Sequence, residues 1–121
     1  MDSDEKEWLD IAADNLVTAR ILYDNERLRD AAYYCQQVAE KSLKAVQVRK
    51  LKRFDKVHDL QELAESVGAP TQVKKNSKVL TKYYISARYP IREEGSITEN
   101  DVSMAISQAE EVLEWARLTL R

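Results

Sequence analysis

The chain has few glycines, prolines and cysteines, the residues on which β-rich and disulfide-bonded folds depend. Its 121 residues include only two glycines and two prolines, so it lacks the tight turns that a β protein needs. Cys35 is its only cysteine, which excludes an intrachain disulfide and a cysteine-based zinc site. No run approaches the ~20 apolar residues of a membrane span, and no signal-peptide segment opens the chain. These absences favour a soluble cytoplasmic protein that forms one domain over residues 1–121.

Apolar side chains recur at helical spacing along almost the whole chain. The spacing predicts helices over about residues 3–25, 29–52, 60–67, 72–89 and 99–120. No alternation typical of a strand reaches a useful length. We therefore expect an all-α fold, an up-and-down helical bundle of four longer helices plus one short helix. The second segment is apolar on more than one side, which predicts that it lies at the centre of the bundle.

Several of the expected helix ends carry capping residues. Asp59 is the expected N-cap of the short helix, and Gly68 is expected to end it. Thr71 is the expected cap of the next helix. Thr98 and Asp101 predict a variant capping box at the start of the last helix.

Charge is segregated along the chain although the net charge is only −2. Residues 1–30 and 93–121 each have a balance of −5, whereas residues 31–92 have a balance of +8. Two tracts in that central part, Lys41–Phe54 and Ser66–Arg92, contain no acidic residue. The asymmetry suggests an anionic partner, such as a nucleic acid, a nucleotide or an acidic protein. The alternative is intramolecular, with acidic outer helices complementing a basic centre.

A polar stripe runs along the second helical segment. Gln37, Glu40, Lys41 and Lys44 are spaced i, i+3, i+4 and i+7, which places them on one side of a helix. One interpretation is a solvated surface with a Glu40–Lys44 pair worth about 0.3–0.5 kcal/mol, and local chemistry alone favours it. The other is a polar cluster that lines a groove or contacts a partner. Cys35, on the neighbouring face of small residues, is expected to be a buried thiol.

The order of four motifs along the chain is more specific than any one of them. They are Trp8-Leu9-x-x-Ala12, Gln36-Gln37-Val38-Ala39-Glu40-Lys41, His58-Asp59-Leu60 and Ala87-Arg88-Tyr89-Pro90. The sequence resembles the HEPN family of small helical domains, from Trp8 to about Leu118. The resemblance implies a helical homodimer that binds a nucleotide, RNA or a partner protein. Family members of this size are often encoded beside a minimal nucleotidyltransferase and form a toxin–antitoxin pair with it.

The same resemblance raises the question of ribonuclease activity. Some members of the family cut RNA without a metal through an Arg-x4–6-His motif, with histidine as acid or base and arginine facing the phosphate. The expected place for that motif is around Arg88, and no histidine follows it. Arg53 and His58 match the pattern, but at the junction of the second and third helices. The helix start at Asp59 favours a role for His58 in fixing this turn over catalysis, although an imidazole titrates near neutrality.

Arg88 is the stronger candidate for a phosphate contact. It lies at the expected end of a helix, before a proline that restricts the backbone at Tyr89. An arginine with aromatic neighbours can bind phosphate bidentately or stack on a base. Equally, Arg88 could pair with Glu40 or cap the carbonyls of its own helix.

From these patterns we expect a HEPN-like binding module, with catalysis as the alternative. The candidate nucleotide or phosphate ligands are Arg88, Tyr89, Gln37, Glu40, Lys41 and Lys44, and the weak catalytic candidates are His58 and Arg53. A metal site is not expected from one histidine and one cysteine, and no cofactor is expected. The expected partners are a second copy of the chain, a nucleotidyltransferase, and a nucleotide or RNA. A metal-independent ribonuclease with a divergent site is the alternative function.

Overall fold

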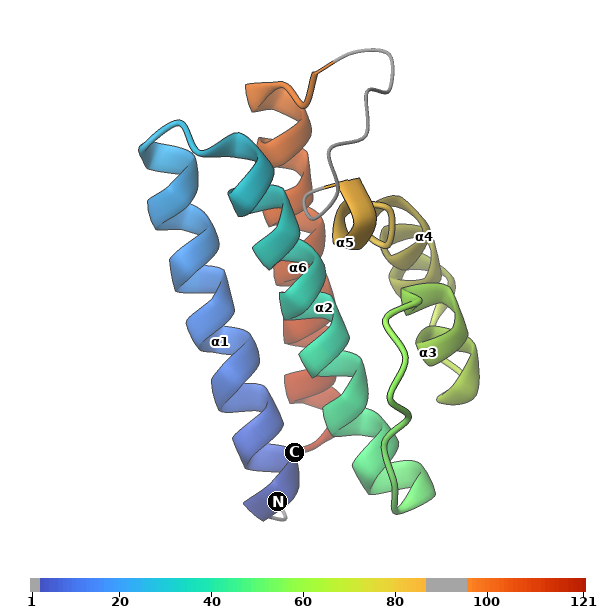
Figure 1. Cartoon of the computed structure of the whole chain (residues 1–121). Coiled ribbons are helices and arrows are strands. Elements are labelled where there is room, and N and C mark those ends of the chain that lie inside the picture. Colours follow the sequence, from blue (N-terminus) through green and yellow to red (C-terminus); the bar gives the residue numbers. More distant parts are fainter. Residues whose placement is uncertain (1–2, 87–95) are drawn as a thin grey trace.

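The computed structural model describes residues 3–86 and 96–121. These residues form helices and contain no strand, which confirms the all-α prediction. The helices are α1 (Ser3–Asp24), α2 (Leu28–Leu51), α3 (Leu60–Ser66), α4 (Thr71–Leu80), α5 (Tyr83–Ser86) and α6 (Glu99–Thr119). In Figure 1, α1, α2 and α6 run side by side over the length of the molecule, and α3, α4 and α5 lie together beside α2. None of the described helices is long and apolar enough to cross a membrane.

Helix α2 lies at the centre of the bundle, as its apolar pattern predicts. It contacts α1, α6, α3, α4 and α5. Close packing is possible because the residues it turns inward are small, and Ala31, Ala32, Cys35 and Ala39 are fully buried. Burial raises the pKa of the Cys35 thiol to about 12, so this side chain packs as a small apolar group.

The capping predictions are confirmed at two helices and wrong at a third. The Asp59 carboxylate accepts hydrogen bonds from the first turn of α3, and Thr98 and Asp101 form a reciprocal capping box on α6. Gly68 follows α3 with a φ of +62°, a conformation that suits glycine. Thr71, however, is the first residue of α4, and its N-cap is Pro70. Proline at this position offers no side-chain acceptor, so α4 begins without a side-chain cap.

The fourth predicted helix is also interrupted, because α4 ends at Leu80 and α5 begins at Tyr83. The break lies where Thr81 Oγ1 accepts a hydrogen bond from the backbone N–H of Leu60, at 3.1 Å. After the break the Tyr83 side chain is buried. The break therefore ties this segment to the start of α3. The predicted continuation to Tyr89 and Pro90 lies outside the described residues.

The segment between α2 and α3 runs back along α2, as the green trace in Figure 1 shows. Lys52 reverses the chain with a φ of +57°. The buried amide of Gln47 then holds Asp55, accepting from its backbone N–H and donating to its carboxylate, both at 3.0 Å. Gln47 also donates to Ser66 Oγ at 2.8 Å. The extended segment thereby carries His58 back to the middle of α2.

Candidate functional site

The polar stripe on α2 is buried, so the interpretation as a solvated surface is wrong. Glu40 is 2% exposed and Lys44 is 5% exposed. The neighbouring Gln36 is fully buried, while Gln37 and Lys41 are partly buried. These five residues and His58 are called the Glu40 cluster below. Polar groups are rarely buried without partners, so the contacts within this cluster explain how it is stabilised. We take the cluster as the centre of the candidate site.

The Glu40 carboxylate accepts hydrogen bonds on both oxygens. Lys44 Nζ lies 3.0 Å from Oε2, and Gln36 Nε2 and His58 Nδ1 lie 3.1 and 3.0 Å from Oε1. Lys41 Nζ forms a longer ion pair at 3.7 Å. Burial by itself would raise the pKa of Glu40, but the bonds from Gln36, His58 and Lys44 and the charge of Lys41 outweigh it and lower this pKa. Glu40 is therefore an anion at neutral pH.

The charged state of Glu40 determines the orientation of the His58 ring. A carboxylate can only accept, so Nδ1 of His58 donates the hydrogen bond to Glu40. The peptide carbonyl of His58 also accepts from Gln36 Nε2 at 3.1 Å. The sequence predicts that His58 fixes the turn at the start of α3, but the hydrogen bonds of this residue are to Glu40 and Gln36 on α2.

Of the two lysines in the cluster, Lys41 has the longer ion pair with Glu40, so its charge is the less well neutralised. Burial and the neighbouring charge of Lys44 lower its pKa, and the charge and hydrogen bonding of Glu40 only partly oppose this. Its Nζ also donates to Gln37 Oε1, whose amide donates to Gln36 Oε1. Two lysines therefore share one carboxylate. A second anion would relieve this imbalance.

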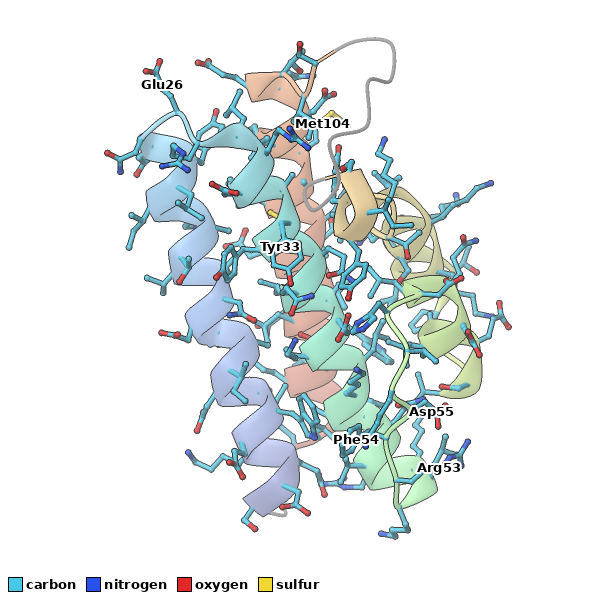
Figure 2. The ribbon with its side chains drawn as sticks, in the orientation of Figure 1. Glu26, Tyr33, Arg53, Phe54, Asp55 and Met104 are labelled. Atoms are coloured by element: carbon cyan, nitrogen blue, oxygen red, sulfur yellow. The ribbon has the colours of Figure 1, made fainter. Side chains whose placement is uncertain are left out.

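A row of aromatic rings borders the cluster, and the sequence analysis did not predict it. His58 stacks on Tyr84, with ring centroids 4.1 Å apart and an interplanar angle of 12°. Tyr84 lies 6.1 Å from Tyr33, which meets Tyr34 edge to face. Figure 2 shows Tyr33 projecting from the exposed side of α2. The sequence shows these three tyrosines, but its helical periodicity does not indicate that Tyr84 lies beside the helix that carries Tyr33 and Tyr34.

A second aromatic group lies at the other end of the cluster. Lys44 Nζ is 5.9 Å from the centroid of the Trp8 ring, a distance typical of a cation–π contact. Trp8 meets Phe54 edge to face, with centroids 4.9 Å apart. Phe54 comes from the segment after α2, where Figure 2 shows it with Arg53 and Asp55. Lys44 thus connects the Glu40 cluster to an aromatic pair built from two elements.

The remaining candidates do not all join the cluster. Arg53 pairs with Asp55, with 3.1 Å between Nε and Oδ1, and its side chain is 60% exposed. Arg88 and Tyr89 lie outside the described residues. Within residues 3–86 and 96–121, no group of three or more histidine, cysteine, aspartate or glutamate side chains could hold a metal ion. The structure therefore brings together Gln37, Glu40, Lys41, Lys44 and His58.

The fold and the site together define a small all-helical domain whose central helix carries a buried charged cluster. The family model described as the HEPN domain matches residues 5–119. The chain belongs to the HEPN family.

Two solved structures are similar to the chain over nearly all of its length. TT1696 from Thermus thermophilus has 26% sequence identity and a TM-score of 0.86, over 96% of this chain and 98% of that one. ST0689, an archaeal HEPN homologue, has 24% identity and a TM-score of 0.82, over 99% and 100% of the two chains. The search of curated proteins gives no match.

Proposed function

We propose that this HEPN domain protein is a cytoplasmic binding module for RNA or a nucleotide, and that the phosphate binds beside Lys41 in the Glu40 cluster. The observation that carries the proposal is the unequal charge of the cluster, in which the buried Lys44 and the partly buried Lys41 share one carboxylate. An incoming phosphate would add the missing negative charge and accept hydrogen bonds from Lys41 Nζ. Arg88 and Tyr89, the two central residues of the Ala-Arg-Tyr-Pro motif, remain further candidate ligands.

The binding test compares Lys41→Gln with Lys75→Gln. Lys75 is exposed on α4, a different helix from the one that carries Lys41, so its variant controls for the general loss of one positive charge. Fluorescence anisotropy with a labelled 12-nucleotide mixed-sequence RNA at 50 mM salt measures affinity, and added salt gives the number of phosphate contacts. We expect Lys41→Gln to lower the affinity and to reduce the salt slope by about 0.7, as for one phosphate contact on a single strand. Equal behaviour of the two variants would contradict the proposal.

We further propose that the protein is a homodimer and the HEPN component of a toxin–antitoxin pair with a minimal nucleotidyltransferase. The family supports the pairing. The surface of α1 supports an interface, because Val17 and Ile21 are one helical turn apart and 54% and 57% exposed. Light scattering of the wild type and of Val17→Glu tests the dimer, and a monomeric wild type would refute it. The pairing predicts that a minimal nucleotidyltransferase is encoded beside the gene and forms a complex with this protein on co-expression, and the absence of a complex would refute that part.

A metal-independent ribonuclease is the second candidate, and the Glu40–His58 contact supports it. Glu40 holds the proton on Nδ1, which leaves the basic Nε2 without a hydrogen bond to the part of the chain that the structure describes. His58 is 48% exposed in its side chain, so a substrate can reach it. In this reaction Nε2 would take the proton of a ribose 2′-hydroxyl as that oxygen bonds to phosphorus. The bond from phosphorus to the 5′-oxygen would break and that oxygen would take a proton from water, leaving a 2′,3′-cyclic phosphate and a 5′-hydroxyl.

The two candidates are separated by incubating RNA with the protein in chelator. Cleavage by the wild type that is lost in both His58→Ala and Glu40→Gln would establish the ribonuclease. Loss in Arg53→Ala as well would add Arg53 to the site, although its pairing with Asp55 argues against this. Intact RNA with measurable binding would leave the binding module as the function.

A further inference from the structure

A hollow of about 280 Å³ lies between the start of α1, the end of α2 and the segment after it. Its lining side chains are those of Asp4, Glu7, Trp8, Ile11, Val48 and Phe54. Two aromatic rings and two aliphatic side chains give it apolar walls, and both acidic residues are exposed. Its volume is just below the range of about 300–1,000 Å³ for pockets that bind small organic molecules, which suits a single side chain of a partner.

The aromatic walls of the hollow are held open to solvent by the structure. The Phe54 side chain is 41% exposed, although burying such a ring would be favourable. Its position is fixed by the next residue, because Asp55 forms two hydrogen bonds with the buried Gln47. The Phe54 ring meets Trp8 edge to face at an interplanar angle of 67°. Two rings at this angle leave a corner into which a flat side chain can insert.

The charge at the rim of the hollow is negative. Asp4 and Glu7 are one helical turn apart on α1, and Glu7 forms no ion pair within residues 3–86 and 96–121. The cations that neighbour the lining residues are all paired with acids: Arg49 with Glu5, Arg53 with Asp55, and Lys44 with Glu40. Among the described residues that line the hollow, none is cationic. The hollow therefore favours a cation over an anion.

A guanidinium group suits these surroundings better than an ammonium group does. It is flat, more weakly hydrated, stacks on aromatic faces and donates to carboxylates from a rigid fork. Tryptophan is the aromatic side chain to which cations bind best. Lys44 Nζ already lies 5.9 Å from the Trp8 centroid, but Glu40 balances its charge at 3.0 Å. The two carboxylates at the rim therefore outweigh its repulsion of a second cation.

The acidic side of α1 continues beyond the hollow. Asp4, Glu7, Ile11 and Asp14 are exposed and spaced three or four residues apart, which places them on one side of the helix. Asp14 lies about 10 Å from Glu7 along the helix axis. A small cation would contact the hollow alone, whereas an extended peptide with basic residues three positions apart spans the same distance. This side of α1 is thus complementary to a basic segment of a protein.

We propose that the hollow binds an arginine side chain of a partner protein. The guanidinium contacts the rings of Trp8 and Phe54 and donates hydrogen bonds to the carboxylates of Asp4 and Glu7. A second basic residue of the same segment pairs with Asp14. This site takes a cation, whereas the site proposed at Lys41 takes a phosphate, so each proposal can fail without the other.

The test uses the fluorescence of Trp8. The chain has two tryptophans, and Trp115→Phe leaves Trp8 as the only reporter. The probes are capped tripeptides with arginine, lysine or citrulline between two glycines, and citrulline keeps the shape of arginine without its charge. We expect the arginine peptide to bind about tenfold more tightly than the citrulline peptide, with the lysine peptide between them. The indole N–H signal of Trp8 in nitrogen-15 NMR spectra of the wild type follows the same titrations without any substitution.

Surface substitutions in the Trp115→Phe background separate the contributions. Phe54→Ala should weaken the arginine peptide about threefold through the lost ring contact. Glu7→Gln should weaken it by a similar factor and should affect the citrulline peptide less. The controls are Ile85→Ala, an apolar side chain 51% exposed on α5, and Glu26→Gln, which Figure 2 places at the opposite end of the molecule from Phe54. Both controls should bind the arginine peptide as the parent does.

A longer peptide tests the second contact. A capped peptide with two arginines three positions apart should bind at least threefold more tightly than the peptide with one arginine. Asp14→Asn should remove this gain. A gain that persists in Asp14→Asn would refute the contact with Asp14.

The outcomes for the arginine site and the phosphate site are distinct. Equal affinity for the arginine and citrulline peptides, or no response of Trp8 to any peptide, would overturn the arginine site. Tighter binding of uridine monophosphate than of the arginine peptide at the hollow would overturn it as well. A Lys41→Gln variant that keeps the full affinity for RNA would overturn the phosphate site alone.

Discussion

Replacing Glu40 by glutamine should destabilise the protein by about 3 kcal/mol. The substitution keeps the volume of the side chain but leaves the Lys44 ammonium, 5% exposed, without its anion. Breaking a buried ion pair from one side typically costs 3–5 kcal/mol. The Trp8 ring near Lys44 offsets about 0.5–1 kcal/mol of this as a cation–π contact, and the glutamine carbonyl can still accept one hydrogen bond. We therefore place the loss at the lower end of the range.

Urea unfolding followed by circular dichroism measures this change. For a slope of about 1.5 kcal/mol per molar urea, a loss of 3 kcal/mol lowers the midpoint by about 2 M. The matched control is Glu65→Gln, because the Glu65–Lys74 pair has a similar distance of 3.3 Å but is 69% and 39% exposed. It should change stability by less than about 0.5 kcal/mol. A Glu40→Gln variant as stable as this control would refute the reasoning.

A double substitution then tests whether the cost comes from the unpaired lysine. Glu40→Gln with Lys44→Met removes both charges and retains the bulk of the lysine stem. Because a buried ion pair gains little over apolar packing, this variant should return to within about 1 kcal/mol of the wild type. A double variant no more stable than Glu40→Gln alone would locate the loss in the contacts to Gln36 and His58.

The lowered pKa of Glu40 also predicts a dependence of stability on pH. Since its pKa in the folded protein is below the unfolded value, the contribution of Glu40 is complete above the ordinary glutamate pKa of about 4.3. It is lost as the pH falls through the lowered, folded pKa. Urea midpoints between pH 7 and pH 3 should therefore fall more steeply for the wild type than for Glu40→Gln. Parallel curves would contradict the assigned charge state.

Three smaller predictions concern the helix ends and the core. Thr98→Ala, which removes the capping box of α6, should cost about 1 kcal/mol in urea unfolding, and a neutral result would count against the cap. Gly68→Ala should cost about 1–2 kcal/mol, because a residue with a Cβ is strained at the φ of +62°. The cost comes from the backbone alone, since no atom lies within 4 Å of the added Cβ. An unchanged urea midpoint would be inconsistent with this backbone conformation. Cys35, buried and with a pKa of about 12, should resist a thiol reagent at pH 8 until urea unfolds the protein, and rapid labelling of the native state would contradict its burial.

The sequence predicted the helices well because their determinants are local. Apolar spacing defined α1, α2 and α6 to within about a residue, and the caps at Asp59 and Thr98 depend only on neighbours within one turn. The break after Leu80 was missed because its hydrogen bond, from Leu60 to Thr81, joins residues 21 positions apart.

The candidate site was predicted in part for the same physical reason. The contacts among Gln37, Glu40, Lys41 and Lys44 follow from helical spacing, so the stripe was visible in the sequence. Its burial was not visible, because the groups that cover it come from other elements. His58 reaches Glu40 through the return of the extended segment, and Trp8 reaches Lys44 through the packing of α1 on α2.

The arrangement of donors around Glu40 determines which cation an anionic ligand can use. Lys44 is held at 3.0 Å by the carboxylate, and drawing it away would leave Glu40 with fewer of the bonds that offset its burial. Lys41 is at 3.7 Å, with a side chain 18% exposed and a pKa lowered by burial and by Lys44. A phosphate beside Lys41 therefore gains an ion pair without breaking the one between Lys44 and Glu40. It also stabilises the positive charge of Lys41, which burial and Lys44 disfavour. Lys44 then holds Glu40 and lies beside Trp8, and these contacts support our proposal that Lys41 is the phosphate ligand.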